Sequence, residues 1–312
     1  MRGISTCGSV WSCPCCQAPI QALRAQEVGR LVAWAEEAGH VVVMLTLTVR
    51  HAWTHELART MAGVAEAWRM VQRGAPWLRW REDVGLVGTV RALEVTHGSA
   101  GWHPHLHVLA VLRRPDVEPF DLRPDAEIGA TMAHALFDPR GDRAEWLALR
   151  WQACVDSVLG WRSRPDLEHG FDVQPARSSS YLSKLGLEIG SSGTKRGGDD
   201  GHRDPWAIAR DATQGDVASA RLWRDFSSAS HGRRQLTWSR GLKRLAGVAV
   251  VTDQAAAALE HSGPALLVAN LEPREWAAVL RAHLVPALLE AAERDPPRAR
   301  ALIRALFRPP DD

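Results

Sequence analysis

Two kinds of hydrophobic pattern alternate along the chain. Segments in which apolar residues recur every three or four positions predict amphipathic helices. These helical segments are residues 17–38, 55–73, 144–160, pieces within 205–230, and 265–308. Runs of apolar and β-branched residues predict strands, and they cover residues 41–49, 86–96, 103–112 and 170–176. The short loop HGSAG between the second and third strands predicts a hairpin. The order strand, helix, hairpin, helix, strand predicts an α+β domain built on an antiparallel sheet.

Composition divides the chain into four parts. The first is rich in cysteine, the second holds the predicted α+β domain, the third is a basic helical extension, and the fourth is helical. In order, these parts are residues 1–18, 19–190, 191–247 and 248–312. Residues 114–142 are rich in Pro, Asp and Gly and predict an insertion or linker, and residues 190–204 are flexible by composition.

The overall composition is that of an ordinary globular protein. The 312 residues are 46% hydrophobic and 24% charged, which is typical of globular chains. The chain has no run of about 18 apolar residues, the length that a membrane span requires. Its N-terminus has no apolar signal-peptide core. We therefore expect a cytoplasmic protein that does not act at a membrane.

Positive charge is concentrated in one part of the chain. The net charge is only +2, but residues 177–244 hold 13 Lys and Arg against 7 Asp and Glu. Such a surplus could face the phosphates of a nucleic acid. Arg177, Lys195 and Arg196 are the candidate contacts. An ordinary solvated helical surface would have the same composition.

Three histidines alternate in the stretch GWHPHLHVL, at positions 103, 105 and 107. Alternate residues of a strand share a face, so His105 and His107 can point at one ion. If the hairpin turns near residue 99 or 100, Glu94 lies opposite His105, with Cβ atoms about 5 Å apart. Two imidazoles and a carboxylate suit Mn²⁺, Mg²⁺ or Zn²⁺ and leave positions open for substrate. His103 is a further ligand, a support for the ligands or a structural residue. Scattered histidines on a partly exposed strand are the alternative.

The stretch SSSYLSKL at residues 178–185 holds the only tyrosine in a chain that has 14 Trp and 5 Phe. On a helix, Tyr181 and Lys184 lie one turn apart on the same face. A free phenol has a pKa of about 10, and a nearby ammonium favours the more nucleophilic phenolate. The pair therefore fits phosphoryl transfer onto tyrosine. A half-buried helical tyrosine beside a solvated lysine, in a chain that is poor in tyrosine through composition bias, is the alternative.

Four of the five cysteines fall within residues 7–16. In a cytoplasmic chain such clustering predicts metal binding before disulfides. Cys13 and Cys16 form a Cys-x-x-Cys pair, and Cys7 is their candidate partner in a structural Zn²⁺ site. The adjacent residues Cys15 and Cys16 rarely bind one ion together, so a fourth ligand is missing, which a translation start further upstream would explain. Reduced or redox-active thiols are the alternative.

Three motifs follow one another in the sequence: LTLT at 45–48, HPHLH at 103–107 and YLSK at 181–184. In this order they resemble the three motifs of the HUH endonucleases. Most narrowly, they are similar to those of single-tyrosine replication initiator (Rep) proteins of rolling-circle plasmids. The stretches CGSVWSCPCC and LTWSRGL (236–242) are similar to actinobacterial members. The resemblance covers about residues 7–245.

The resemblance implies a metal-dependent, strand-specific nick in single-stranded DNA at a replication origin, made by an antiparallel-sheet HUH domain with a ferredoxin- or RRM-like fold. Tyr181 would attack the phosphodiester and keep the 5′-phosphate, and a later transfer would rejoin the ends. His105 and His107 would bind Mn²⁺ or Mg²⁺, with Glu94 as the third ligand from the pairing given above. Lys184 would hold the phosphate or the phenolate.

Further expectations concern the DNA path and the protein partners. Trp102, beside the histidines at the hairpin tip, is the candidate base platform, since stacking on an aromatic ring contributes about 1–3 kcal/mol per base. Thr46 and Thr48 are expected to be sheet and DNA-channel residues. Host helicase and polymerase are the implied partners, and residues 248–312 are candidates for helicase recruitment or duplex binding. Some members carry a Glu one turn before the tyrosine as a base for terminal hydrolysis, whereas this chain has Arg177 there.

Two other classes of function fit parts of the pattern. A transposase or relaxase would share the chemistry, but transposases of this class are usually smaller, and relaxases usually place the tyrosine before the histidines. A non-enzymatic regulator that binds DNA, with a zinc knuckle and structural histidines, is the third hypothesis. A covalent adduct between protein and DNA separates the enzymes from the regulator.

Overall fold

The computed structural model describes residues 7–113, 142–176, 202–258 and 271–306, with short gaps at 283, 285–286, 289–290 and 293–294. The chain forms two compact units, Met1–Leu259 and Glu260–Asp312. The predicted insertion at 114–142, except Asp142, and most of the segment 190–204 lie outside the described residues. Among the residues that are described, no helix has the length and apolarity to cross a bilayer.

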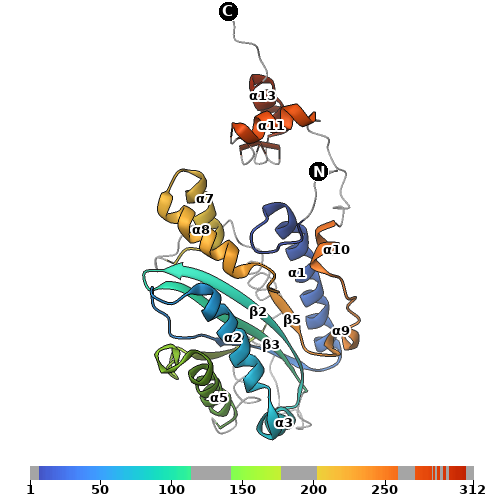
Figure 1. Cartoon of the computed structure of the whole chain (residues 1–312). Coiled ribbons are helices and arrows are strands. Elements are labelled where there is room, and N and C mark those ends of the chain that lie inside the picture. The colour runs from blue at the N-terminus through green and yellow to red at the C-terminus, as the bar shows by residue number, and fades with distance from the viewer. Residues whose placement is uncertain are drawn as a thin grey trace, which may run out of the picture. The chain divides into compact units, whose positions relative to one another are not determined.

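The first unit is built on an antiparallel sheet of five strands, in the spatial order β4-β1-β3-β2-β5 (Figure 1). The strands are β1 (Val41–Leu47), β2 (Leu86–Gly98), β3 (Gly101–Leu112), β4 (Phe171–Pro175) and β5 (Leu236–Trp238). The first four strands confirm the sequence prediction, and the α+β class with an antiparallel sheet is confirmed with them. The edge strand β5 was not predicted, because three residues carry too little pattern to identify a strand.

Helices follow the predicted order along the first unit. They are α1 (Pro14–Glu37), α2 (Leu57–Val71), α3 (Gly74–Asp83), α5 (Asp142–Leu159), the 3₁₀ helix η1 (Trp161–Ser163), α7 (Pro205–Thr213), α8 (Val217–Ser230), α9 (Leu242–Leu245) and α10 (Asp253–Ala258). Helix α3 was not predicted, and α9 and α10 were not identified as separate helices within the two segments expected to be helical, 191–247 and 248–312. Helix α3 begins with Gly-Ala-Pro, which by itself indicates a turn, and α9 and α10 have only 4 and 6 residues.

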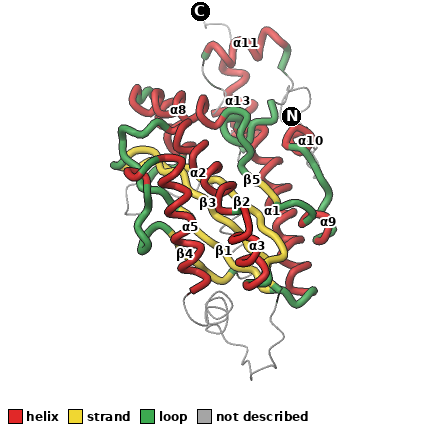
Figure 2. The backbone as a smooth tube through the Cα atoms, turned by 60° about the horizontal axis from the view of Figure 1, so that its bottom comes forward, coloured by secondary structure: helices red, strands yellow, loops and turns green. Residues whose placement is uncertain are grey.

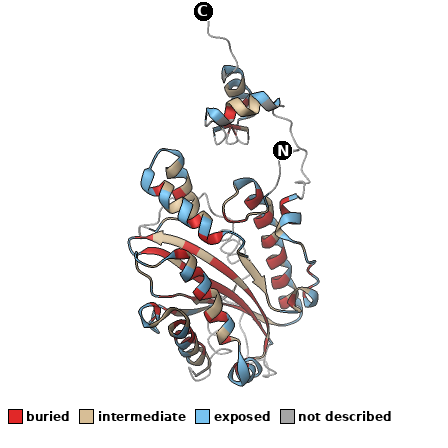
Figure 3. Ribbon diagram, viewed as in Figure 1, coloured by how far each residue is buried: buried red, intermediate tan, exposed pale blue. Residues whose placement is uncertain are grey.

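Helices cover both faces of the sheet (Figure 2). Helices α2 and α5 pack on the face formed by Val43, Leu45, Leu106 and Val108. Helix α1 packs on the opposite face together with α9 and the segment that follows it, and the strand residues of this second core are Val42, Met44, Val90, Ala92, Leu109 and Val111. Alternation along each strand produces the two faces, and it leaves β2 and β3 largely buried (Figure 3).

A buried charge network fixes α1 against the segment after β5. Glu27 is only 4% exposed at its side chain and accepts hydrogen bonds from Arg24 at 2.7 Å and Lys243 at 2.8 Å. Arg24 also donates to Asp253 at 2.6 Å and to the carbonyl of Val251 at 2.8 Å. Since α1 contributes a whole layer of the fold, this network holds that layer in place.

Replacing Glu27 by alanine is expected to lower the free energy of unfolding by about 3–5 kcal/mol, because it leaves two largely buried cations without their shared partner. Chemical denaturation followed by circular dichroism measures this change. The matched control is Glu66→Ala, which removes an exposed pairing with Arg69 and Arg73 and should cost less than about 1 kcal/mol. Equal losses in the two variants would contradict the prediction.

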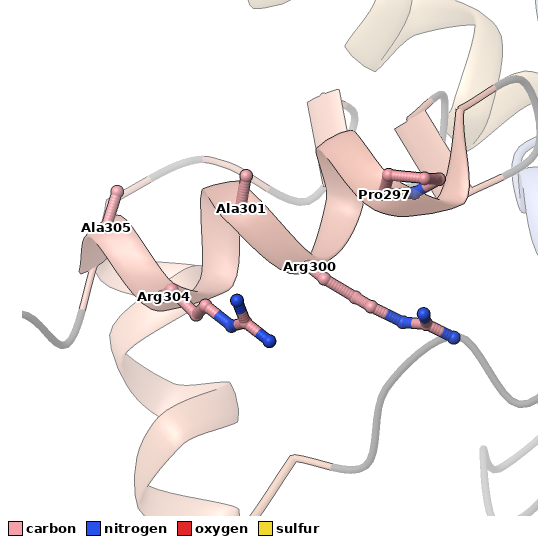
Figure 4. A pocket seen from close by; sticks show the side chains of 5 residues that line it. All are labelled: Pro297, Arg300, Ala301, Arg304 and Ala305. Carbon is pink, nitrogen blue, oxygen red and sulfur yellow. The ribbon is translucent and has the colours of Figure 1, made fainter.

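The second unit is helical where the structure describes it. It contains α11 (Pro273–Arg281) and α13 (Pro296–Leu306), which pack around a small core of Val279, Leu288, Ala291 and Ala299. These helices confirm the apolar spacing read between 265 and 308. The side chains of Arg300 and Arg304 extend from the same side of α13, where they line a hollow together with Pro297, Ala301 and Ala305 (Figure 4).

Candidate functional site

The β2–β3 hairpin brings together the three predicted metal ligands. Its turn consists of residues 99 and 100, and Gly98 pairs with Gly101. Gly101 has a φ of 92°, in the left-handed region that glycine tolerates. This turn pairs Glu94 with His105, as predicted from the hairpin sequence, and His107 lies two residues further along the same face.

Glu94, His105 and His107, called here the Glu94 triad, have ligand atoms that all lie within 4.8 Å of one another. The Glu94 Oε2 atom is 3.1 Å from His105 Nε2 and 2.9 Å from His107 Nε2. For ligands about 2.1 Å from an ion, neighbouring octahedral positions are about 3.0 Å apart. The observed separations therefore fit a divalent cation held by these three side chains.

The contact between Glu94 and His105 requires a positive charge between the two side chains. His105 Nδ1 lies 3.2 Å from the carbonyl oxygen of His103. Since a carbonyl only accepts hydrogen bonds, Nδ1 carries the proton in the neutral ring and Nε2 presents a lone pair. That lone pair faces the Glu94 carboxylate at 3.1 Å, so a proton or a metal ion has to lie between two acceptors. Ligand histidines are commonly oriented by carbonyls in this way.

The electrostatics of Glu94 favour its ionised form. Burial alone would raise the pKa of Glu94, but the charge and hydrogen bond of His105, together with those of His107, outweigh burial and hold the pKa well below its ordinary value. An ionised carboxylate is the form that binds a hard or borderline cation.

Thr46 supports the triad from the neighbouring strand. It pairs with His107 across β1 and β3, and its Oγ1 lies 3.2 Å from His107 Nδ1. When Nε2 of His107 serves as a ligand, Nδ1 carries the proton and donates it to this hydroxyl. Thr46 was expected to be only a sheet or channel residue, because its contact depends on β1 lying beside β3, which the sequence does not specify.

Replacing Thr46 by valine is expected to weaken Mn²⁺ binding by about tenfold or more, because it removes the hydrogen bond that orients the His107 ring. Isothermal titration calorimetry measures the affinity. Thr48→Val is the matched control, since the Thr48 hydroxyl bonds the carbonyl of His169 instead and its loss should leave Mn²⁺ affinity unchanged. Equal affinities in wild type and Thr46→Val would refute the role of this hydroxyl.

His103 supports the triad through its backbone and is not one of its three members. Its ring stacks on His51, with centroids 4.4 Å apart and planes at 14°. Burial, followed by the charge of His105, lowers the pKa of His103 to about 3, and burial also lowers the pKa of His51. Both rings are therefore neutral near pH 7 and can stack closely. His51 was not predicted, because nothing in its local sequence indicates a contact with residue 103.

The N-terminal cysteines form a second group of candidate ligands. Sulfur atoms of Cys7, Cys13 and Cys16 lie within 4.8 Å of one another, and Cys7 Sγ is 3.8 Å from Cys16 Sγ. Thiolates about 2.3 Å from a tetrahedral Zn²⁺ would be about 3.8 Å apart, so the spacing fits. A backbone hydrogen bond from Ser9 lowers the pKa of Cys7, whereas burial raises the pKa of Cys13 to about 12. Cys15 is exposed and lies outside this group.

The side chain of Trp102 points to the sheet face opposite the Glu94 triad, so it does not form the predicted base platform. Its side chain is buried, with 8% exposure, and its ring stacks on Phe226 of α8 at 5.7 Å and meets His97 edge-on. Residue 102 alternates with 103, 105 and 107 and so points to the opposite face. No ring face is left for a base, and this corrects the expectation for Trp102.

The remaining predicted site residues lie outside the described residues. They are Arg177, Tyr181, Lys184, Lys195 and Arg196. Their roles stay predictions from the sequence.

Part of the chain is similar to known replication proteins. Residues 2–115 match the family Rep_1, described as a replication protein, and this stretch contains both the cysteine cluster and the Glu94 triad. The chain is also distantly homologous to Protein rep of Streptomyces lividans, with 25% identity over 79% of this chain and 64% of that protein. It thus spans somewhat under two thirds of the length of that relative. No solved structure matches the chain.

Proposed function

We propose that this chain initiates rolling-circle replication of a plasmid by nicking and rejoining single-stranded origin DNA. The observation that carries the proposal is the Glu94 triad, in which a carboxylate and an imidazole lone pair face each other at 3.1 Å on one sheet face. The match of residues 2–115 to a replication-protein family supports the biological context.

The strand order gives further support. Apart from the additional helices α3 and η1, the elements from β1 to β4 run strand, helix, strand, strand, helix, strand, with the central sheet order β4-β1-β3-β2. This is the βαββαβ pattern of ferredoxin-like folds, which is the fold expected of an HUH catalytic domain. The triad lies on the face opposite α2 and α5, next to the apolar strand positions of the core that α1 and α9 share.

In the proposed reaction, the phenol oxygen of Tyr181 attacks a phosphodiester phosphorus. A bond forms between that oxygen and phosphorus as the phenol gives up its proton, and the bond from phosphorus to the 3′ oxygen breaks. The leaving 3′ oxygen takes up a proton, so the products are a 5′-phosphotyrosine and a free 3′-hydroxyl. A divalent cation bound by the triad would supply charge neutralisation at the phosphate. Lys184, one helical turn from Tyr181, would stabilise the phenolate. The reverse attack by a 3′-hydroxyl rejoins the strand and releases the tyrosine.

Other parts of the chain have supporting roles in this proposal. Cys7, Cys13 and Cys16 would hold a structural Zn²⁺, while Arg177, Lys195 and Arg196 would contact phosphates. Host helicase and polymerase would act on the opened origin after the nick.

The test is a search for a covalent adduct between protein and DNA. Labelled single-stranded oligonucleotides that tile both strands of the DNA around the gene are incubated with the full chain and Mn²⁺, then separated on a denaturing gel. The proposal expects an adduct on one strand at one position, and none when EDTA replaces Mn²⁺. Binding without an adduct at any position or with any divalent metal would favour a non-enzymatic regulator and overturn the proposal.

A further inference from the structure

The loop between β1 and α2, residues 50–56 and called here the Trp53 loop, presents an unusual aromatic side chain. The Trp53 ring is 80% exposed. By contrast, six other tryptophans are at most 8% exposed: Trp11, Trp68, Trp77, Trp80, Trp102 and Trp151. Trp161, at 72%, is the other strongly exposed tryptophan of the described residues, and it lies outside the hairpin in the 3₁₀ helix η1. Burial of an indole contributes a large favourable free energy, which an exposed indole does not gain. The exposed Trp53 indole is therefore available to stack on a ligand, and its surroundings decide which kind.

The loop is held firmly although its indole is exposed. The amide of His55 donates to the carbonyl of Ala52 at 2.9 Å, which closes a β-turn with Trp53 at its tip. The Trp53 backbone lies against the hairpin turn so closely that a Cβ added to Gly101 would be 2.8 Å from its Cα. A ring carried by such an anchored turn loses little conformational entropy when it binds a partner.

Two contacts anchor the loop. One lies beside the Glu94 triad, and the other holds the backbone of Arg50 against the 3₁₀ helix η1. His51 of the loop stacks on His103, whose ring centroid lies 4.9 Å from that of His105. On the other side, the Arg50 amide donates to the carbonyl of Ser163 at 3.0 Å. The Arg50 guanidinium is 64% exposed and only 4.0 Å from Asp166. Exposed pairs of this kind are weak, so Arg50 can exchange the carboxylate for a phosphate oxygen.

The surroundings of Trp53 favour a nucleobase over a protein partner. The rest of the loop consists of Arg50, His51, Ala52, Thr54, His55 and Glu56, so the indole is the one large apolar group among mostly polar residues. A protein interface needs about 800 Å² on each partner with a contiguous apolar centre. Single-stranded DNA needs only a ring to stack on and positive charge for the backbone.

We propose that Trp53 is the platform on which one unpaired base of the DNA strand stacks beside the Glu94 triad, with Arg50 contacting the adjoining phosphate. This inference rests on the proposed nicking function and identifies a positioning residue for it. Stacking there would hold the strand so that the phosphate to be cleaved stays at the metal site.

The experiment measures binding of the full chain to a dye-labelled oligonucleotide containing the mapped nick site, in a Tyr181→Phe background so that no cleavage occurs. Replacing Trp53 by alanine should weaken binding by about tenfold to a hundredfold, and replacing it by phenylalanine should restore most of the affinity. The control is Leu78→Ala on α3, which is 60% exposed and lies at the other end of β2 from the hairpin (Figure 1). It should bind as the background protein does.

A scan with abasic sites identifies the base. One abasic position should weaken binding to the background protein and have no further effect in the Trp53→Ala variant, because the same contact has already been lost. Mn²⁺ affinity should not change in Trp53→Ala, which separates stacking from damage to the triad. Unchanged DNA affinity in Trp53→Ala, or additive effects at every abasic position, would overturn the inference. If the wild type forms no adduct at all, the nicking function fails instead.

Discussion

Replacing Tyr181 by phenylalanine is expected to abolish the covalent adduct between protein and DNA and to lower the nicking rate at least about 10⁴-fold, the scale seen when an enzyme loses its nucleophile. The change removes one oxygen atom and keeps the ring, so affinity for single-stranded DNA and for Mn²⁺ should stay within about twofold of wild type. The chain contains one tyrosine, so no second phenol can take over the reaction.

A denaturing gel with labelled DNA measures the adduct, and fluorescence anisotropy measures binding under the same conditions. A mass-spectrometric map of the wild-type adduct should place the nucleotide on the peptide that contains Tyr181. An adduct that persists in the phenylalanine variant would show that a different side chain is the nucleophile. Loss of both adduct and DNA binding would instead point to a misfolded variant, and circular dichroism would identify that case.

The position of Glu94 opposite His105 could be predicted because a short hairpin leaves little freedom of register. The loop HGSAG has only a few places to turn, and alternation then determines which side chains share a face. The structure turns at residues 99 and 100, within the expected window. Local sequence was sufficient for the triad because all three residues belong to one hairpin.

Contacts between strands that are distant in sequence could not be predicted in the same way. Thr46 reaches His107 only because β1 lies beside β3. Similarly, the ring of Trp102 is covered by Phe226, a residue of α8 that lies 124 positions later. Alternation along β3 by itself places Trp102 on the face opposite the histidines, so this part of the sequence already argued against Trp102 as a base platform beside them.

The short elements depend on tertiary contacts that have little sequence signal. Strand β5 forms because Leu236 to Trp238 pair with β2, and α9 and α10 are too short to be stable alone. Lys243 of α9 and Asp253 of α10 reach the buried pair of Arg24 and Glu27 on α1. Such elements acquire their structure from the surface on which they pack.

Replacing His107 by alanine is expected to weaken Mn²⁺ binding by more than about a hundredfold, beyond the usual effect of losing a group that only orients a ligand. It should also reduce adduct formation below detection. The ring of His107 is 2.9 Å from Glu94 and is oriented by Thr46. Its loss leaves a carboxylate and one imidazole, and two protein ligands compete poorly with water for a divalent ion.

The matched control is His169→Ala, which removes a histidine whose side chain is 76% exposed and should leave metal affinity and nicking unchanged. Mn²⁺ is the appropriate probe because it prefers nitrogen and oxygen ligands, whereas the thiols of Cys7, Cys13 and Cys16 favour Zn²⁺.

If His107→Ala binds Mn²⁺ as the wild type does, the catalytic cation lies outside the Glu94 triad. If it loses Mn²⁺ but still forms the adduct, the chemistry at the phosphate does not need this ion. Either result would separate the metal site from the nicking reaction, whereas loss of both functions together would link them.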